Sequence, residues 1–232
     1  MDRMLELQAN LQDVEREISD ACIAANRNRA DITLIAVTKT WPASDIDLLA
    51  GLGITDVGEN RDQEAKPKHD EVQASTLTWH AIGQLQTNKA KSVAAWADVV
   101  HSVDRLDLVT ALTKAVTGRE SPLGVLIQAN LDPEPIDNRG GALPNELMAL
   151  AESISNCSGL KLQGVMGVAP LAGDDDLAFS KLQEFALQIQ GAFPAANWIS
   201  AGMSADFATA LKYGATHLRI GSSILGKRAL QG

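Results

Sequence analysis

The chain has little cysteine, few aromatic residues and no long apolar run. Cys22 and Cys157 are its only cysteines, too few for a disulfide framework or a cysteine metal cluster. Two isolated thiols are typical of a reducing compartment, so we expect a cytoplasmic protein. No apolar stretch approaches the roughly 18 residues that a membrane-spanning helix needs. The N-terminus (MDRMLE) is charged at once, unlike a signal peptide. We therefore expect no membrane partner.

Positive charge is also scarce. The 20 lysine and arginine residues face 29 aspartate and glutamate residues, which gives a formal net charge of −9. Because an acidic surface repels phosphate backbones, we expect no nucleic-acid partner. With 45% hydrophobic and 21% charged residues, the composition is that of a globular protein with one sizeable core. The length suits a single α/β barrel, so we expect residues 1–232 to form one domain.

The hydrophobic pattern predicts an N-terminal helix followed by eight strands. Leu7, Leu11, Val14, Ile18 and Cys22 recur at steps of three and four, as on one face of a helix. Short β-rich runs then alternate with helical stretches. The runs span residues 34–40, 55–58, 78–83, 98–103, 124–131, 162–169, 197–203 and 217–224.

Alternating strands and helices imply parallel strands joined by right-handed crossovers. An open doubly wound sheet and a closed (β/α)8 TIM barrel both satisfy this pattern, and the count of eight favours the barrel. An open sheet that binds a dinucleotide would carry a glycine-rich turn after its first strand, yet residues 38–42 (TKTWP) contain no glycine. The sequence therefore predicts an α/β barrel preceded by a helix.

Polar residues at the carboxyl ends of the strands are the candidates for a site, because the loops after barrel strands build the active face. They are Lys39, Glu59, Asn60, His80, Met203, Ser204, Arg219, Gly221, Ser222 and Ser223. The long polar loop at 132–141 follows the fifth strand. A mobile lid and an ordinary solvated loop are both open interpretations of it.

Lys39 ends an apolar strand, on the side that it shares with Ile35 and Val37. If that side is the barrel lumen, desolvation favours the neutral amine, which can attack an aldehyde to form an imine. The alternative is a lysine that reaches into solvent at a strand end.

Arg219 lies in mid-strand and projects away from its apolar neighbours, where an arginine needs a partner. Gly221 and Ser222 follow it, and Gly202 and Ser204 end the seventh strand. Loops after strands seven and eight are the usual phosphate site of this fold, although two ordinary glycine turns would look the same. A molecule with an aldehyde and a phosphate fits all these features. Pyridoxal 5′-phosphate (PLP) is the obvious candidate, and a sugar phosphate held by a Schiff-base aldolase stays open.

Six motifs occur in a fixed order: LIAVTKT, VGENRDQEA, WHAIGQLQTNK, GVMGVAP, ISAGMSADF and LRIGSSILG. Together they resemble the pyridoxal-phosphate homeostasis proteins, which are single-domain relatives of the N-terminal barrel of alanine racemase. The resemblance spans roughly residues 31–228. It implies a PLP-binding barrel and makes the aldolase remote.

The resemblance implies seven cofactor-binding positions. They are Lys39, Asn60, Met166, Ser204, Arg219, Gly221 and Ser222. Lys39 matches the lysine that holds PLP as an internal aldimine, and Arg219 matches the arginine that faces the pyridine nitrogen. Asn60 matches a residue near the ring, and Met166 a strand end that lines the pocket. The other three match phosphate ligands.

Three positions depart from the family pattern. Arg61 stands where the family often has an aromatic residue, and Ser222 where it often has threonine. The segment Met166 to Pro170 (MGVAP) replaces a common Met-Ala-Ile-Pro. None removes a cofactor contact, but they leave the preference for a partner or substrate open.

The resemblance also bears on turnover. A guanidinium can only donate hydrogen bonds, so Arg219 would keep the pyridine nitrogen unprotonated and the ring a weaker electron sink. Racemisation needs a base on each face. Lys39 would be one. In the related racemases the other is a tyrosine from the second domain of the dimer partner, whereas the only tyrosine here, Tyr213, precedes the eighth strand, away from the site. For His80, a hydrogen-bonded structural role is favoured over a proton relay in the lumen.

These expectations describe a protein that holds PLP on Lys39 and takes part in intracellular PLP homeostasis with little or no turnover. Free amino acids and PLP-accepting apo-enzymes are its expected partners. A PLP-dependent amino-acid racemase or a related enzyme is the alternative. We assign no catalytic residue and no metal ligand. Since no second domain follows the eighth strand, we expect a monomer.

Overall fold

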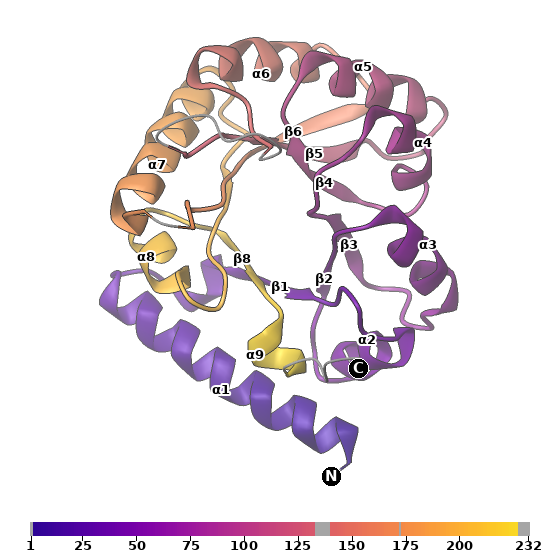
Figure 1. The fold of residues 1–232 in the computed structure, drawn as a ribbon, viewed down its shortest axis with the longest axis vertical. Coiled ribbons are helices and arrows are strands. Elements are labelled where there is room, and N and C mark those ends of the chain that lie inside the picture. Colours follow the sequence, from indigo (N-terminus) through magenta and orange to yellow (C-terminus); the bar gives the residue numbers. More distant parts are fainter. Residues whose placement is uncertain (1, 133–139, 172, 227–232) are drawn as a thin grey trace.

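The computed structural model describes residues 2–132, 140–171 and 173–226. Eight parallel strands close into a barrel, and the last strand pairs with the first (Figure 1). They are β1 (Thr33–Val37), β2 (Asp56–Glu59), β3 (Thr78–Ala81), β4 (Val99–Val103), β5 (Leu123–Gln128), β6 (Leu160–Met166), β7 (Trp198–Ser200) and β8 (His217–Ile220). The prediction of a closed barrel over an open sheet is confirmed.

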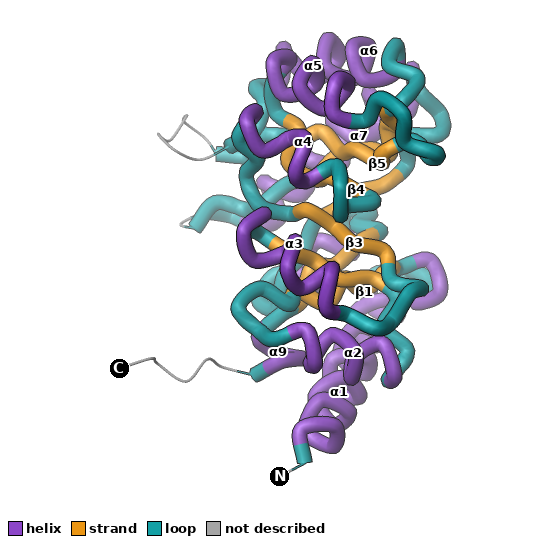
Figure 2. The backbone as a smooth tube through the Cα atoms, turned by 90° about the vertical axis from the view of Figure 1, so that its right-hand side faces the viewer, coloured by secondary structure: helices purple, strands orange, loops and turns teal. Residues whose placement is uncertain are grey.

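Helices surround the strands, as the views along and across the barrel show (Figures 1 and 2). They are α1 (Arg3–Ala24), α2 (Ala43–Gly51), α3 (Asp62–Glu71), α4 (Ala90–Val93), α5 (Leu106–Ala115), α6 (Leu147–Ser155), α7 (Asp175–Ala192), α8 (Phe207–Lys212) and α9 (Ser222–Leu225). Short 3-10 helices lie at η1 (Arg29–Asp31), η2 (Thr87–Lys89) and η3 (Pro144–Glu146). Over the described residues, no helix combines the length and apolar character that crossing a bilayer requires.

The N-terminal helix α1 packs along one edge of the barrel, beside α8 and α9 (Figure 1). Its predicted apolar stripe is the face that it buries, since Leu7, Val14, Ile18 and Cys22 are buried and Leu11 is partly buried against the core. Asp2 caps the helix by accepting a hydrogen bond from the Met4 amide at 3.2 Å. The amphipathic pattern thus translates directly into packing.

Alternation along the strands divides the core into an outer layer beneath the helices and an inner layer in the lumen. A small apolar group in the lumen comprises Val99, Leu126 and Met166, with Trp198 packed against it. Other buried positions are polar, among them His101 on β4 and Ser200 on β7. Because β4 and β7 are not neighbours in the barrel, the hydrogen bond between these two side chains crosses the lumen.

Each predicted run overlaps one strand, but several strands begin or end at other residues than predicted. β1 ends at Val37 instead of residue 40, and β5 ends at Gln128 instead of residue 131. Beyond the end of β5 the apolar residues stay buried, with Ala129 and Leu131 at 3% and 4% exposure. The apolar pattern therefore reports burial, which continues after the backbone has left the sheet.

Candidate functional site

A cavity of about 430 Å³ opens where the strands end. This volume lies within the range of roughly 300–1,000 Å³ that is common for small-molecule sites. The residues that line it follow or end six different strands. They are Val37, Lys39, Asn60, Ile82, Val168, Met203, Ser204, Ala205, Arg219, Gly221 and Ser222. Six of the seven cofactor-binding residues predicted from the sequence therefore share one cavity.

Met166 is the exception. It is 2% exposed and lies in the lumen against Val99 and Leu126. Val168, two residues further along the chain, lines the cavity instead. Met166 is the last residue of β6, as expected, but its side chain lies deeper in the lumen than the residues that line this cavity.

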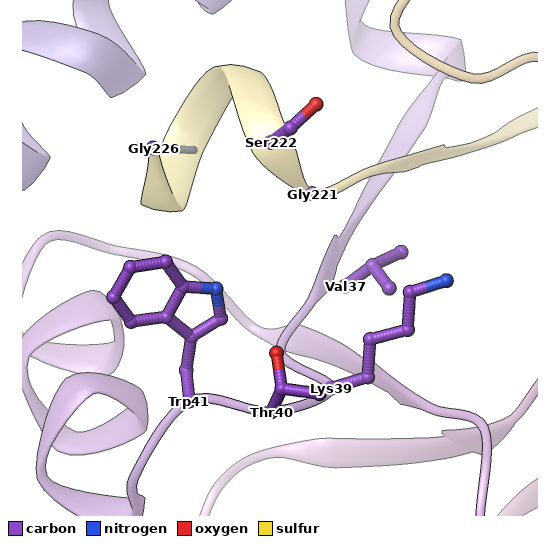
Figure 3. Close-up of a pocket in the computed structure, with 7 residues that line it drawn as sticks. All are labelled: Val37, Lys39, Thr40, Trp41, Gly221, Ser222 and Gly226. Atoms are coloured by element: carbon purple, nitrogen blue, oxygen red, sulfur yellow. The ribbon is translucent and has the colours of Figure 1, made fainter. Parts of the chain in front are cut away.

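Lys39 lies in a turn two residues after β1, which corrects its expected place on the strand. The chain turns here because Trp41 N–H donates to the Thr38 carbonyl at 3.1 Å, and Thr40 has a φ of +70°. The Lys39 side chain is half-buried and runs alongside Val37, away from Trp41 (Figure 3). Its amine therefore reaches the mouth of the cavity.

A second cavity of about 300 Å³ lies against the same residues. It shares Lys39, Gly221 and Ser222 with the first and extends to Trp41 beneath α9 (Figure 3). The Arg3 guanidinium stands 4.5 Å from the centre of the Trp41 ring. The start of α1 thus contributes to the support of this wall.

Three ionic side chains hold the Lys39 turn from behind. Lys68 Nζ on α3 donates to Glu59 Oε1 at 2.8 Å and to Glu64 Oε1 at 2.9 Å. It also donates to the Thr38 carbonyl at 2.9 Å, while the Thr38 hydroxyl donates to Glu59 Oε1 at 2.7 Å. Thr40 N–H donates to Glu64 Oε1. We call Glu59, Glu64 and Lys68 the ionic cluster, and it fixes the residues on both sides of Lys39.

The charges of the ionic cluster are unevenly compensated. Burial raises the pKa of Glu59, although hydrogen bonds from Lys68 and Thr38 act in the opposite sense. Partial burial works to raise the pKa of Glu64, but hydrogen bonds from Lys68 and from Thr40 N–H outweigh it and lower that pKa. Within the described chain, Glu59 Oε2 is buried without a hydrogen-bond partner. Lys68 is therefore the main support of a deeply buried carboxylate.

Arg219 projects into the lumen, as its alternation with apolar neighbours predicts. It is 5% exposed, and it donates to Ser200 Oγ at 2.6 Å and to the Gly167 carbonyl at 2.9 Å. Burial lowers its pKa to about 10, and the nearby Asp206 carboxylate works against that shift. The guanidinium therefore keeps its charge at neutral pH.

Close backbone packing explains the glycines at the two strand ends. A Cβ on Gly221 would lie 3.1 Å from the Val37 carbonyl oxygen, where β8 approaches β1. Gly202 has a φ of +93°, and its Cβ would lie 2.9 Å from Phe207 Cα. Gly221 caps α9, whose first N–H groups have no acceptor within the helix. These N–H groups start at the cavity wall.

The cavity wall is electropositive, although the chain as a whole has a net charge of −9. In the part of the chain that the structure describes, the lining contains two cations, Lys39 and Arg219, and no carboxylate. Among these residues a negatively charged ligand would meet two cations, neutral donors and apolar side chains, while the Asp206 carboxylate is not part of the lining. The cavity is thus suited to an anion with a group that reacts with an amine.

The other residues considered from the sequence lie elsewhere. His80 is buried in the lumen and hydrogen-bonded at both ring nitrogens, as the structural interpretation predicts. Tyr213 donates to Asp176 Oδ1 at 2.8 Å and is not part of the cavity lining. The lid that we considered at 132–141 falls largely on residues 133–139, which lie outside the described residues.

The alanine racemase N-terminal domain family matches residues 10–229 of this chain. A pyridoxal phosphate homeostasis protein of Mycobacterium bovis is 38% identical over 249 residues, covering 99% of this chain and 96% of the relative. The chain belongs to the family of pyridoxal phosphate homeostasis proteins. A solved structure of PipY from Synechococcus elongatus with PLP bound is similar to it, with 30% identity, a TM-score of 0.78 and coverage of 90% of this chain and 100% of PipY.

The racemase fold is shared more distantly. Alanine racemase from Corynebacterium glutamicum has 12% sequence identity and a TM-score of 0.70, over 95% of this chain and 60% of the racemase. At that identity the likeness establishes the barrel alone. The family match and the fold match thus agree with the resemblance that the six motifs indicate.

Several residues that shape the site were missed by sequence reasoning. Lys68 and Glu64 carried a usable signal, because they lie four residues apart on a helix that directly follows Gly-Glu-Asn. His101 and Ser200 carried little, since each is one polar residue in an apolar run. Only the closed barrel brings them into contact.

Proposed function

We propose that this chain binds PLP covalently through Lys39 Nζ and serves intracellular PLP homeostasis with little turnover of its own. The proposal rests on one observation above others: the amine of Lys39, the buried cation of Arg219, the segment before α8 and the start of α9 converge on one cavity, whose lining has no carboxylate among the described residues. The names of the relatives, and the PLP in the PipY structure, support the choice of ligand.

The residues present fit PLP. The cofactor supplies an aldehyde that condenses reversibly with a primary amine, releasing water. Lys39 Nζ is the primary amine at the cavity. Ser204, Gly221 and Ser222 would hold the phosphate with hydroxyl and backbone donors. Arg219 would face the pyridine nitrogen, and Asn60 would lie beside the ring.

Low turnover follows from the scarcity of proton carriers. In the lining of the described cavity, Lys39 and Arg219 are the titratable side chains. Arg219, with a pKa of about 10, stays protonated at neutral pH and does not accept a proton. Only Lys39 remains to take up and release protons, whereas racemisation uses two such groups.

We also infer that residues 1–232 form one PLP-binding domain that acts as a monomer in the cytoplasm. PLP would leave the open cavity by exchange with the amine of a free amino acid or of a PLP-accepting apo-enzyme. The net charge of −9 supports the absence of a nucleic-acid partner.

The test is an absorption spectrum of the protein with PLP, before and after borohydride. The wild type should show a visible band that reduction makes permanent. Lys39→Ala should lose both the band and the trapped adduct. Lys66→Ala is the matched control, because Lys66 is exposed on α3 outside the cavity.

Equal labelling of Lys39→Ala and wild type would overturn the attachment. Loss of optical rotation from an incubated L-amino acid, abolished in Lys39→Ala, would instead establish the racemase alternative.

A further inference from the structure

A continuous chain of hydrogen bonds runs through the lumen from the cavity to the opposite end of the barrel. Arg219 donates to Ser200 Oγ at 2.6 Å, and Ser200 Oγ lies 2.9 Å from His101 Nδ1. His101 Nε2 lies 2.8 Å from His80 Nδ1, and His80 Nε2 lies 2.9 Å from Asp56 Oδ1. We call these five residues the lumen chain.

The lumen chain is almost completely buried. Ser200, His101 and His80 are inaccessible, and Arg219 is 5% exposed. The Asp56 side chain, at the start of β2, keeps 15% exposure. Because the five residues come from five different strands, the lumen chain depends on closure of the barrel. It links the cavity to the opposite end of the barrel.

Arg219 and Asp56, at the two ends of the lumen chain, determine which atom donates in each of its hydrogen bonds. Arg219 can only donate, so Ser200 Oγ accepts from it. The single Ser200 hydroxyl proton then goes to His101 Nδ1. His101 consequently carries its proton on Nε2 and donates to His80 Nδ1. His80 also carries its proton on Nε2 and donates to the Asp56 carboxylate.

The opposite order of protons would leave one buried donor without an acceptor. If His101 carried its proton on Nδ1, Ser200 Oγ would accept from both His101 and Arg219. The Ser200 hydroxyl proton would then lack an acceptor in a buried setting, which is unfavourable. The observed distances and the donor inventory therefore favour one ordering.

The charges around the lumen chain agree with a neutral His101 and an ionised Asp56. Burial, with the nearby His80 and Arg219, lowers the pKa of His101 well below its usual value. Burial acts to raise the pKa of Asp56, but the hydrogen bonds from His80 and Thr55 outweigh it and lower that pKa.

Two further titratable groups lie beside the lumen chain. His217 on β8 stacks on Trp198 at a ring separation of 4.0 Å, and burial lowers its pKa to about 3. Asp206, before α8, faces Arg219. Neither interrupts the line of hydrogen bonds. The described residues also contain no group of three metal-ligating side chains, so a metal does not explain the two histidines.

We propose that the lumen chain is a polarised support for Arg219, in which Ser200, His101 and His80 are positioning residues with both imidazoles protonated on Nε2. Through it, the hydrogen bonding of Arg219 in the cavity depends on the protonation state at Asp56, at the opposite end of the barrel. The claim about proton order is independent of the proposed function. Its consequence for a bound cofactor rests on that function.

The proton order is tested on the protein without cofactor, by ¹⁵N NMR of the histidine rings near neutral pH. Both His80 and His101 should show a protonated Nε2 and an unprotonated Nδ1. A majority of either ring protonated on Nδ1 would overturn the proposed order.

Ser200→Ala tests the positioning role in the same samples, and it removes only one hydroxyl. The His101 ring should change toward a mixture of tautomers, and the Arg219 side-chain resonances should broaden. His217→Phe is the matched control, because it changes a buried lumen histidine outside the chain and keeps an aromatic ring on Trp198. If the Arg219 resonances were identical in Ser200→Ala and wild type, the proposed positioning role would be wrong.

The cofactor consequence is measured by PLP titration. Ser200→Ala should weaken PLP binding about tenfold, since one hydrogen bond to a charged group is lost, and should shift the absorption band. If wild type and Ser200→Ala bind PLP with the same affinity, the inferred effect on the cofactor is refuted and the proposed function is not. A wild type without any band would refute the proposed function and leave the NMR result to decide the proton order.

Discussion

Two buried networks hold the two cations of the cavity, and they distribute charge in different ways. Behind Lys39, the ionic cluster brings Lys68 into direct contact with Glu59 and Glu64. Behind Arg219, the lumen chain separates the cation from Asp56 by a serine and two imidazole rings. The first network holds a backbone turn, and the second holds a side chain.

The difference shows what each network is sensitive to. Removal of one member of a buried ion pair leaves an uncompensated charge, so the ionic cluster should fail when a single partner is lost. The lumen chain contains neutral links whose order depends on proton positions. We therefore expect the loss of a hydroxyl group to disrupt the lumen chain less than the addition of a proton.

The largest effect should come from Lys68→Met, which leaves Glu59 buried without its cation. We expect a loss of about 3–5 kcal/mol in the free energy of unfolding, measured by urea denaturation. The double variant with Glu59→Gln should recover part of this loss, because it also removes the buried negative charge. A double variant that is less stable than Lys68→Met would show that the cluster acts by packing rather than by charge.

Acid should next separate the buried histidines of the lumen from the ionic cluster. The pKa of His217 is lowered from 6.5 to about 3, so the unfolded chain binds a proton below pH 6.5 that the folded chain refuses. Stability should therefore fall as the pH falls, by about 2 kcal/mol between pH 6.5 and 5 from this residue. The lowered pKa of His101 adds in the same direction.

Glu64 of the ionic cluster responds in a more acidic range than the lumen histidines. The pKa of Glu64 is lowered from 4.5, so its contribution is present above that value and is lost only below it. Urea titrations at pH 7, 5 and 4 on wild type and His217→Phe measure the separation. The variant should lose less stability than wild type between pH 7 and 5. Identical losses in the two proteins would contradict the lumen as the source.

The barrel and most of the cavity were predictable because local rules determine them. Period-two runs locate the strands, and the rule that sites lie after barrel strands selects Lys39 and Arg219. Neither rule determines which side chains meet across the lumen. His101 and Ser200 are 99 residues apart and touch only because the strands close with one particular register.

Met166 ends β6 as expected but lies outside the lining of the cavity, for a related reason. The sequence pattern cannot show where β6 stops pairing and its last residues begin to line a cavity. The same limit explains why Lys39 was expected on the strand, whereas it lies in the turn beyond Val37. Burial can be estimated from single residues, but strand ends depend on the partners of each backbone group.

The smallest effect should come from Glu64→Gln, which sharpens the comparison within the ionic cluster. Glu64 keeps 26% side-chain exposure, and glutamine retains an oxygen that can accept from Thr40 N–H. We expect a loss of about 0.5 kcal/mol, as for a partly exposed pair spaced by four residues. Hydrogen exchange at the Thr40 amide should stay slow, because its acceptor remains. If exchange there became as fast as in Lys68→Met, the charge of Glu64 and not its oxygen would be what holds the turn of Lys39.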